Sequence, residues 1–530
     1  MLFNSLDFAI FLPLVFILYW FVTNRNLKLQ NFLIVAASYL FYGWWDWRFL
    51  SLILFSTIVD YTIGLKISKE ENQTRRKILL WASIIVNLGF LGFFKYYNFF
   101  LDNFVSAFSF FGTPINAQGL NIILPVGISF YTFQTLSYTI DVYKRKLEPT
   151  KDFVAFTAFV SFFPQLVAGP IERASNLLPQ FYKKRIFKKE NDLRGVRLIL
   201  WGLAKKVVIA DAIAPSVDNI FSNYERYPST ILVLGAFLFS FQIYCDFSGY
   251  SDIAIGLARV MGFDFPHNFR TPYFSRNFSE FWQRWHISLS SWLKDYLYIP
   301  LGGNRGGSFG SVFFIVLPLF LLSIFWSDSI QTTLIYLSIL VIVSIITAYH
   351  MRKSEANMVK GFTYMNNMVT MLLGGLWHGA SWVFYFWGFL HGTYLIIQRF
   401  LGKPFGHLMT ALRFPKPLQQ AIDILIVYFF TCLAWVFFRA PDFDVAITYI
   451  QGIASLESFT ITSIVNKFWV LKGFILIGIL LFVEISDFKF NYSQLIQKSP
   501  TFRVMSFVIL LWIIAFFGSF GANAFIYFQF

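Results

Sequence analysis

Long apolar runs recur along this sequence and are separated by short polar segments. The runs lie near residues 6–22, 29–45, 49–65, 78–101, 122–140, 207–222, 230–258, 308–326, 332–349, 418–438, 469–485 and 504–521. At a rise of about 1.5 Å per residue, helices of roughly this length cross the hydrocarbon core of a bilayer. Because 57% of the residues are hydrophobic and only 13% are charged, the chain cannot be a water-soluble globule. We therefore predict an all-α polytopic integral membrane protein with the lipid bilayer as its environment.

Basic residues gather in the segments between the apolar runs. They give the chain a formal net charge of +15, but their position indicates membrane orientation by the positive-inside rule and does not indicate nucleic-acid binding. The loop 66–77 is accordingly predicted to be cytoplasmic, and counting the spans from it places both termini outside the cytoplasm. The two cysteines, Cys245 and Cys432, lie in apolar runs, so the sequence predicts neither a disulfide framework nor a metal site.

One apolar segment, 153–168, interrupts the alternation of inside and outside loops. It lies between two basic segments, 144–151 and 183–206, so both of its ends belong on the cytoplasmic side. A single membrane crossing is therefore excluded. We expect a re-entrant or surface-lying segment that turns near Phe163 and Pro164, since non-helical backbone at membrane depth must be buried in protein.

A second interruption holds two histidines in an apolar stretch, MLLGGLWHGASWVFYFWGFLHG, Met371 to Gly392. Its flanking charges require two shorter arms, near 362–376 and 382–398, which meet within the membrane and place His378 at their junction. An ionisable ring in hydrocarbon is a functional candidate by default, and the surrounding glycines allow close approach of a substrate. We favour a functional over a packing role for His378. The reverse holds for His391, which lacks the cluster of small residues.

The segment 263–307 is the least membrane-like part of the chain and is predicted to be cytoplasmic and amphipathic. A helix is expected to begin at Ser279, and its apolar residues recur at helical spacing. These residues are Trp282, Trp285, Leu289 and Leu293. His286 lies on the same predicted helix. From the residues alone, a functional role and an interfacial structural role for His286 are equally open.

Other polar motifs favour structural interpretations. Asp246 and Asp252 are six residues apart, which is not one face of a helix, so we interpret them as interior polar anchors with Arg259 as a partner. The glycine-rich segment 302–307 lacks the Lys-Ser/Thr of a P-loop, and no strand pattern precedes it. The sequence therefore disfavours nucleotide hydrolysis as the activity.

Six motifs together are similar to those of the membrane-bound O-acyltransferase family. They are FYGWWDWRF, LPVGISFYTFQTLSYTIDVY, FFPQLVAGPIER, CDFSGYSDIAIGLARVMGF, FWQRWHISLSSWLKDYLYIPLGG and GGLWHGASW, and they extend over nearly the whole chain. The resemblance is strongest to the bacterial subgroup that O-acetylates alginate, peptidoglycan and other exopolysaccharides. It implies a ring of tilted helices around a tunnel, with re-entrant segments and cytoplasmic amphipathic helices.

The resemblance also implies a site and a reaction. His378, in the Trp-His-Gly motif, would be the catalytic base, and His286 would be the second motif histidine near the cytoplasmic end. The acyl donor would be a cytoplasmic thioester, acetyl-CoA, with no bound cofactor and no metal. The acceptor would be a hydroxyl of an extracytoplasmic polysaccharide, reached through a separate esterase-like partner protein at the bacterial cytoplasmic (inner) membrane. Basic residues in 183–206 and 270–305 could hold the CoA phosphates, although their role as topology signals is favoured for most of them.

The expected organisation is a single membrane-embedded domain, 1–530. It comprises N-terminal helices in 1–77, a catalytic core of about 78–400 and additional helices in about 418–521. Two alternative functions remain open. One is a D-alanyl or longer-chain acyltransferase of the same family. The other is a non-enzymatic acyl or solute transporter, which the sequence disfavours because charged residues inside several spans and an internal repeat are not apparent.

Overall fold

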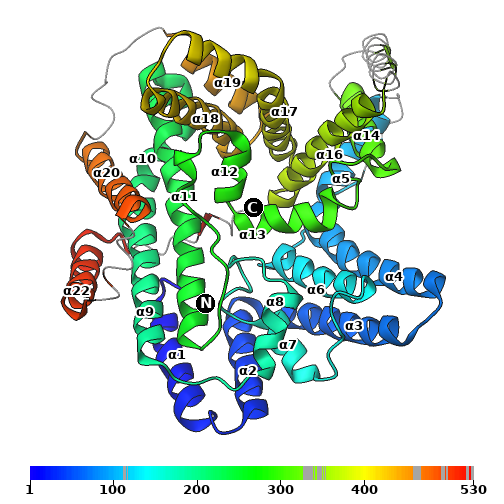
Figure 1. Cartoon of the computed structure of the whole chain (residues 1–530), viewed down its shortest axis with the longest axis vertical. Coiled ribbons are helices and arrows are strands. Elements are labelled where there is room, and N and C mark those ends of the chain that lie inside the picture. Colours follow the sequence, from blue (N-terminus) through cyan, green and yellow to red (C-terminus); the bar gives the residue numbers. More distant parts are fainter. Residues whose placement is uncertain are drawn as a thin grey trace. The chain divides into compact units, whose positions relative to one another are not determined.

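The computed structural model of the chain is built from helices (Figure 1). It describes all residues except 111–114, 116, 326–337, 339–340, 343–348, 350, 352–353, 457–466, 491–495, 497–498, 521–524 and 527–530. Five helical stretches among the described residues are long and apolar enough to cross a membrane. They are Leu27–Lys69, Gln73–Phe108, Ser229–Val260, Lys416–Arg439 and Pro500–Phe517. The predicted all-α, polytopic membrane architecture is thereby confirmed, while the tunnel stays a prediction.

The chain divides into two compact units, and each is described by itself. Unit 1 comprises Met1–Leu91, Pro125–Thr271 and Ile447–Phe530, and unit 2 comprises Gly92–Leu124 and Pro272–Ala446. Unit 1 contains the helices α1 (Leu6–Ile17), η1 (Leu18–Val22), α2 (Leu27–Asp46), η2 (Trp47–Phe49), α3 (Leu50–Lys69), α4 (Gln73–Leu91), α6 (Ile128–Tyr143), α7 (Phe153–Ser161), α8 (Ala174–Leu177), η4 (Leu178–Tyr182), α9 (Lys189–Leu203), η5 (Ala204–Ala210), α10 (Asp211–Ser222), η6 (Tyr224–Arg226), α11 (Ser229–Val260), α20 (Lys467–Phe490) and α22 (Pro500–Phe517).

The N-terminal helices begin where polar side chains cap them, and they coincide with the predicted apolar runs. The Ser5 hydroxyl accepts a hydrogen bond from the backbone N–H of Phe8 at 3.3 Å, which starts α1. The Asn26 side chain accepts one from the N–H of Lys28 at 3.0 Å, which starts α2. Each cap satisfies a backbone donor that has no partner within its own helix.

The segment 153–168 is too short to cross a bilayer as one helix. Helix α7 has nine residues and ends at Ser161, so it spans roughly 14 Å at 1.5 Å per residue. The chain then turns through Phe163 and Pro164, as predicted, and both are buried. The Phe163 N–H donates to the Ser38 hydroxyl at 3.1 Å, which satisfies a buried backbone group at the turn. The re-entrant or surface-lying position of this segment stays a prediction.

Helices α9 and α11 run side by side in unit 1 (Figure 1) and approach closely through glycines. A Cβ atom on Gly195 would lie 2.7 Å from the carbonyl oxygen of Gly256, and one on Gly202 would lie 2.4 Å from that of Gly249. The two pairs are seven residues apart on each helix, so a stripe of small residues forms the contact. Such stripes let helix backbones pack closely in membrane proteins.

Charged side chains are buried where α9 continues through the π-helix η5 into α10. Lys205 pairs with Asp252 at 2.5 Å, and Lys206 pairs with Asp211 at 2.9 Å and with Asp246 at 2.6 Å. Burial of such charges requires close pairing, which these contacts provide. The two aspartates of α11 are therefore anchored by lysines of η5.

Three sequence-based expectations are corrected here. Arg259 does not pair with Asp246 or Asp252 and instead approaches Asp264 at 3.8 Å. Lys205 and Lys206 are not loop residues, because they lie inside a helix with less than 5% of their surface exposed. The candidate membrane-spanning stretches themselves contain charged residues, among them Asp60, Lys95, Asp246 and Asp252, so the argument that charged residues are missing from the spans was wrong. It no longer separates an enzyme from a transporter.

Unit 2 contains η3 (Gly92–Tyr96), α5 (Tyr97–Phe110), η7 (Pro272–Phe274), α12 (Phe278–Arg284), α13 (Ile287–Leu293), η8 (Lys294–Tyr298), α14 (Phe309–Phe325), α16 (Glu355–His378), α17 (Trp382–Ala411), α18 (Lys416–Arg439) and the first four residues of α19 (Phe443–Ala454), whose remaining residues belong to unit 1. Helix α19 was not predicted from the sequence. Most of the predicted run 332–349 lies outside the described residues.

Helices α16 and α17 form the two arms predicted for the histidine-containing stretch. They pack against each other, and the chain turns between them at residues 379–381. A side chain on Gly375 would collide with the backbone of Phe384, and one on Gly388 would collide with that of Met371. Glycine is therefore needed at both positions for the close crossing that holds the junction together.

Candidate active site

His378 is the last residue of α16 and stands at the junction of the two arms. Only 5% of its surface is exposed. The helix ends there because Gly379 adopts an extended conformation. The Ser381 hydroxyl then accepts a hydrogen bond from the Val383 N–H at 3.4 Å and starts α17. The predicted position of His378, at the break between two helices, is confirmed.

Aromatic rings from three helices enclose the His378 imidazole. Its ring centre lies 5.0 Å from that of Trp377, 5.1 Å from that of Trp387 and 5.2 Å from that of Phe438, all in edge-to-face geometry. These rings come from α16, α17 and α18. Edge-to-face contacts fix the orientation of a ring as well as burying it. Contacts with these three rings therefore hold the imidazole in place and shield it from bulk water.

His286 lies beside His378, although 92 positions separate them in the sequence. The two ring centres are 6.4 Å apart, and the His286 ring is 5.7 Å from that of Trp377. None of the His286 surface is exposed. The Ser288 hydroxyl lies 3.5 Å from its Nδ1 atom. The structure therefore brings together the two motif histidines that the family resemblance singled out.

The local structure around His286 differs from the prediction in two ways. The expected single helix is two helices, α12 and α13, because His286 adopts a left-handed backbone conformation with φ of 44°. Helix α12 is capped by Asn277 and not by Ser279, since the Asn277 side chain accepts from the Glu280 N–H at 2.8 Å. The His286 ring is buried in protein, and its position relative to the membrane interface stays a prediction. Non-glycine residues with positive φ are uncommon and often mark functional sites.

Lys95 and Tyr96 were missed by the sequence analysis and contact the end of α16. The Lys95 ammonium donates hydrogen bonds to the carbonyl oxygens of Trp377 at 2.8 Å and of His378 at 3.0 Å. The Tyr96 hydroxyl donates to the carbonyl of Leu376 at 2.5 Å. Both residues belong to the π-helix η3. The available signal was a lysine inside the apolar run 78–101, and intramembrane cations usually have a specific partner.

Comparisons with known proteins show the family to which this chain belongs. Residues 47–326 match the membrane-bound O-acyltransferase family, which is more than half of the chain. The chain is 38% identical to a probable alginate O-acetylase of Azotobacter vinelandii over 471 residues, which cover 88% of this chain and 80% of the relative. The chain belongs to the membrane-bound O-acyltransferase family.

More distant relatives of this O-acyltransferase act on other acceptors. It is 32% identical to a peptidoglycan O-acetyltransferase of Helicobacter pylori over 490 residues, covering 87% of this chain and 81% of the relative. It is 30% identical to a teichoic acid D-alanyltransferase of Bacillus subtilis over 185 residues, which is 34% of this chain and 46% of the relative.

His391 lies in the same unit of this acyltransferase, in a packing environment. Its ring is stacked 5.8 Å from Phe281 with an interplanar angle of 7°, and lies 4.7 Å from Trp387. Within the described residues, neither of its ring nitrogens has a hydrogen-bond partner. The ring contacts are packing contacts, and the structural role expected from the sequence stays a prediction.

Two of the basic residues predicted as phosphate ligands in 270–305 are engaged elsewhere. Arg276 and Arg284 both contact Glu280, at 3.3 Å and 2.6 Å. The glycine-rich loop 302–307 is fastened to α16, since the Asn366 side-chain amide donates to the carbonyls of Gly303 and Gly306 at 2.9 Å. In this acyltransferase the loop thus has a structural explanation that needs no bound nucleotide.

Proposed function

We propose that this acyltransferase moves an acetyl group from a cytoplasmic thioester, acetyl-CoA, to hydroxyls of an extracytoplasmic polysaccharide. His378 is the general base. Alginate and peptidoglycan are the acceptor classes named for the relatives. The observation that carries the proposal is the approach of His286 to within 6.4 Å of His378, between ring centres, inside an aromatic enclosure. Titratable side chains buried together at a helix break are typical of catalytic sites.

The reaction requires one proton to be moved twice. Neutral imidazole of His378 takes the proton of the attacking hydroxyl, because the reference pKa of histidine lies near 6.5. The hydroxyl oxygen then forms a bond to the thioester carbonyl carbon and gives a tetrahedral oxyanion. Collapse of this intermediate breaks the C–S bond, and the imidazolium returns the proton to the departing thiolate. The products are an acetyl ester and a free thiol.

His286 and Lys95 support this step in different ways. His286 presents a second ring that can hydrogen-bond or hold a proton next to the reacting atoms. Lys95 fixes the backbone that carries His378 and does not itself need to contact the substrate. The surrounding tryptophans exclude bulk water, which limits hydrolysis of the thioester.

The proposed position in the membrane indicates on which side a partner protein would act. We propose that residues 1–530 act as one multi-pass unit in the bacterial cytoplasmic membrane, with both termini outside. An extracytoplasmic esterase-like protein then receives the acetyl group and passes it to the polysaccharide. The attacking hydroxyl at His378 would in that case belong to a serine of this partner.

Substitution of His378 by Gln tests the proposal. Glutamine is similar in size and can hydrogen-bond, but it cannot accept a proton at neutral pH. Loss of the base should lower acetyl transfer from acetyl-CoA by on the order of 10² to 10⁴. The matched control is His407→Gln, which makes the same change at an exposed histidine of α17. Acetyl incorporation is measured at equal protein levels together with thermal stability. A well-folded His378→Gln protein with near wild-type activity would contradict the mechanism.

The same assay separates the alternative functions. A teichoic acid D-alanyltransferase is a relative over part of the chain, so D-alanyl and longer-chain acyl thioesters are compared with acetyl-CoA as donors. Preference for either would replace the acetyl assignment and keep the reaction class. Uptake of labelled donor into proteoliposomes without release of free thiol would instead indicate a transporter.

A further inference from the structure

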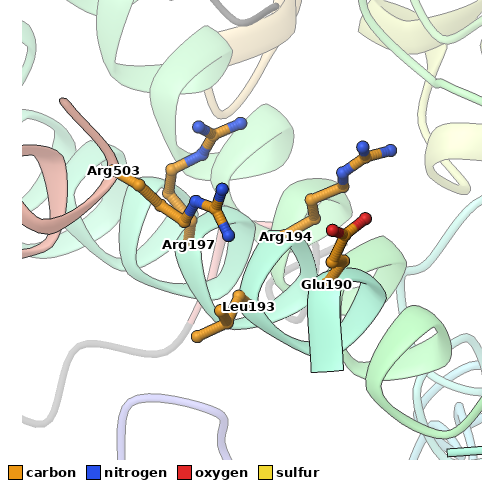
Figure 2. Close-up of a pocket in the computed structure, with 5 residues that line it drawn as sticks. All are labelled: Glu190, Leu193, Arg194, Arg197 and Arg503. Carbon is orange, nitrogen blue, oxygen red and sulfur yellow. The ribbon is translucent and has the colours of Figure 1, made fainter. Parts of the chain in front are cut away.

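Three arginines from two helices of unit 1 surround one hollow. Arg194 and Arg197 lie on α9, and Arg503 lies near the start of α22, about 300 positions later in the chain. Glu190 and Leu193 complete the lining (Figure 2). The hollow is open to its surroundings, and the space of about 290 Å³ in and around it includes open solvent; all three arginines are half-buried.

The packing of α9 determines this arrangement. Gly195 faces α11, where a side chain would collide with the Gly256 carbonyl. Arg194 and Arg197 are three residues apart and therefore share one helical face. Helix α22 packs against α9, and its Arg503 side chain reaches the same hollow (Figure 2). The convergence is thus a consequence of the helix contacts and not of a flexible loop.

The cations at this hollow repel one another. Burial lowers the pKa of Arg197, and the positive charges of Arg194, Arg503 and Arg259 lower it further, while Asp487 opposes the shift. In the described part of the chain, neither Arg194 nor Arg197 forms an ion pair or a side-chain hydrogen bond. Glu190 supplies one exposed carboxylate to this lining, and the half-buried guanidinium groups of Arg194 and Arg197, which do not pair with it, would be stabilised by a further anion.

Membrane topology alone does not explain this cluster. The positive-inside rule requires basic residues near helix ends, and exposed lysines such as Lys183, Lys184 and Lys189 satisfy it. It does not require arginines from distant helices to converge on one point. The planar guanidinium fork matches a phosphate group, to which it donates two parallel hydrogen bonds.

We propose that Arg194, Arg197 and Arg503 form a binding site for a phosphate group. Two sources have this chemistry. One is the headgroup of an anionic phospholipid, whose acyl chains would lie along α22, where the apolar residues Val504, Val508 and Trp512 are exposed. The other is a phosphate of a soluble donor such as CoA. The site does not depend on the role proposed for His378.

The test compares two variants of the full-length protein that lose the same charge. One carries Arg194→Gln, Arg197→Gln and Arg503→Gln. The control carries Lys183→Gln, Lys184→Gln and Lys189→Gln, which are exposed and do not line the hollow. Binding is measured at about 0.15 M salt, where long-range surface attraction is screened. One arm uses phosphatidylglycerol against phosphatidylcholine in mixed micelles, and the other uses CoA against pantetheine.

The wild-type protein and the lysine variant should bind one phosphate probe in preference to its uncharged or zwitterionic counterpart. The arginine variant should bind at least about tenfold more weakly, because it loses several charge-assisted hydrogen bonds. Selective binding of phosphatidylglycerol identifies a lipid site, and selective binding of CoA identifies a donor site. The proposal is overturned if the arginine variant binds both probes as the wild type does. Equal weakening in the lysine variant would also overturn it, because it would show non-specific attraction.

The single variant Arg197→Lys guards against misfolding of the triple variant. It keeps the charge and removes the planar fork. Weaker phosphate binding by this variant supports a bidentate contact, and unchanged binding by a folded Arg197→Lys protein contradicts it.

Discussion

Lys95 donates a hydrogen bond from its ammonium group to the backbone carbonyl of His378, at 3.0 Å. The last carbonyls of a helix have no partner within the helix and carry its negative dipole end. A cation at this position therefore neutralises the end of α16 and fixes the residue whose side chain we propose as the base. Lys95 also donates to the carbonyl of Trp377, and the Tyr96 hydroxyl donates to the carbonyl of Leu376, so three successive carbonyls at the end of α16 have partners.

Substitution Lys95→Met should lower catalysis by displacing His378. Methionine has a similar length but no donor and no charge, so two carbonyl groups lose their partner. A misplacement of about 1 Å at the base can cost about 10²-fold in rate. We expect this loss in kcat for acetyl transfer, with KM for acetyl-CoA little changed, because Lys95 holds backbone rather than substrate.

The double variant separates positioning from a general structural effect. If Lys95 acts through His378, Lys95→Met should cost little more activity once His378→Gln is present, since coupled residues are not additive. Additive losses would indicate an independent role. Tyr96→Phe removes one hydrogen bond and no charge. In thermal unfolding measurements it should therefore destabilise the protein less than Lys95→Met does.

His286 is predicted to take part in catalysis rather than in assembly. The variant His286→Asn is suited to the test, because asparagine tolerates the left-handed backbone that His286 adopts. It keeps hydrogen bonding and removes proton transfer. Acetyl transfer should fall on the order of 10²-fold, the lower end of a general acid–base contribution. His286→Ala should impair donor use as well, while partner binding in pull-down assays is retained. Wild-type kinetics in both variants would leave His286 with a packing role.

Some features of this site could be predicted from local sequence, and others required tertiary contacts. The junction at His378 was predictable because basic residues on both sides of the stretch excluded a single crossing. The break at His286 was not, since its apolar neighbours follow one helical period and nothing in them indicates a positive φ. Apolar residues at one continuous helical spacing therefore belong to two separate helices.

Partners far apart in the chain account for the other errors. Lys205 and Lys206 have the composition of a basic loop, and only the position of α11 shows that they meet Asp252 and Asp246. Lys95 likewise contacts a residue 283 positions away. Charge patterns along a sequence indicate orientation well, but they cannot separate a solvated cation from one that is paired in the interior.

The orientation of the termini is a further prediction. Tags at Met1 and Phe530 should be accessible to protease added outside intact cells, because the basic loops alternate as the positive-inside rule requires. A cysteine placed at the exposed Ser68, near the end of α3 and within the segment 66–77 that is predicted to be cytoplasmic, should react with a membrane-impermeant maleimide only after permeabilisation. Labelling of that cysteine in intact cells, or protection of either terminus from the protease, would contradict the predicted orientation.

The pH dependence of stability should report the buried carboxyl of Glu172, which is only 1% exposed. Burial raises its pKa from 4.5 to about 8, although a hydrogen bond from the Asn176 side chain, at 2.8 Å, opposes the shift. The unfolded chain releases this proton near pH 4.5, whereas the folded protein keeps it until about pH 8. Stability from this group is therefore fully present below pH 4.5 and is lost as the pH rises towards 8.

Glu172→Gln should remove that dependence, because glutamine keeps the acceptor for Asn176 and does not ionise. Thermal unfolding of the purified protein in detergent is measured between about pH 5 and pH 8.5. The wild-type midpoint should fall across this range more steeply than that of Glu172→Gln. Glu148→Gln is the matched control, since Glu148 is an exposed carboxyl whose neutralisation should leave the slope unchanged. Equal slopes for the wild type and Glu172→Gln would show that the folded protein does not raise the pKa of Glu172.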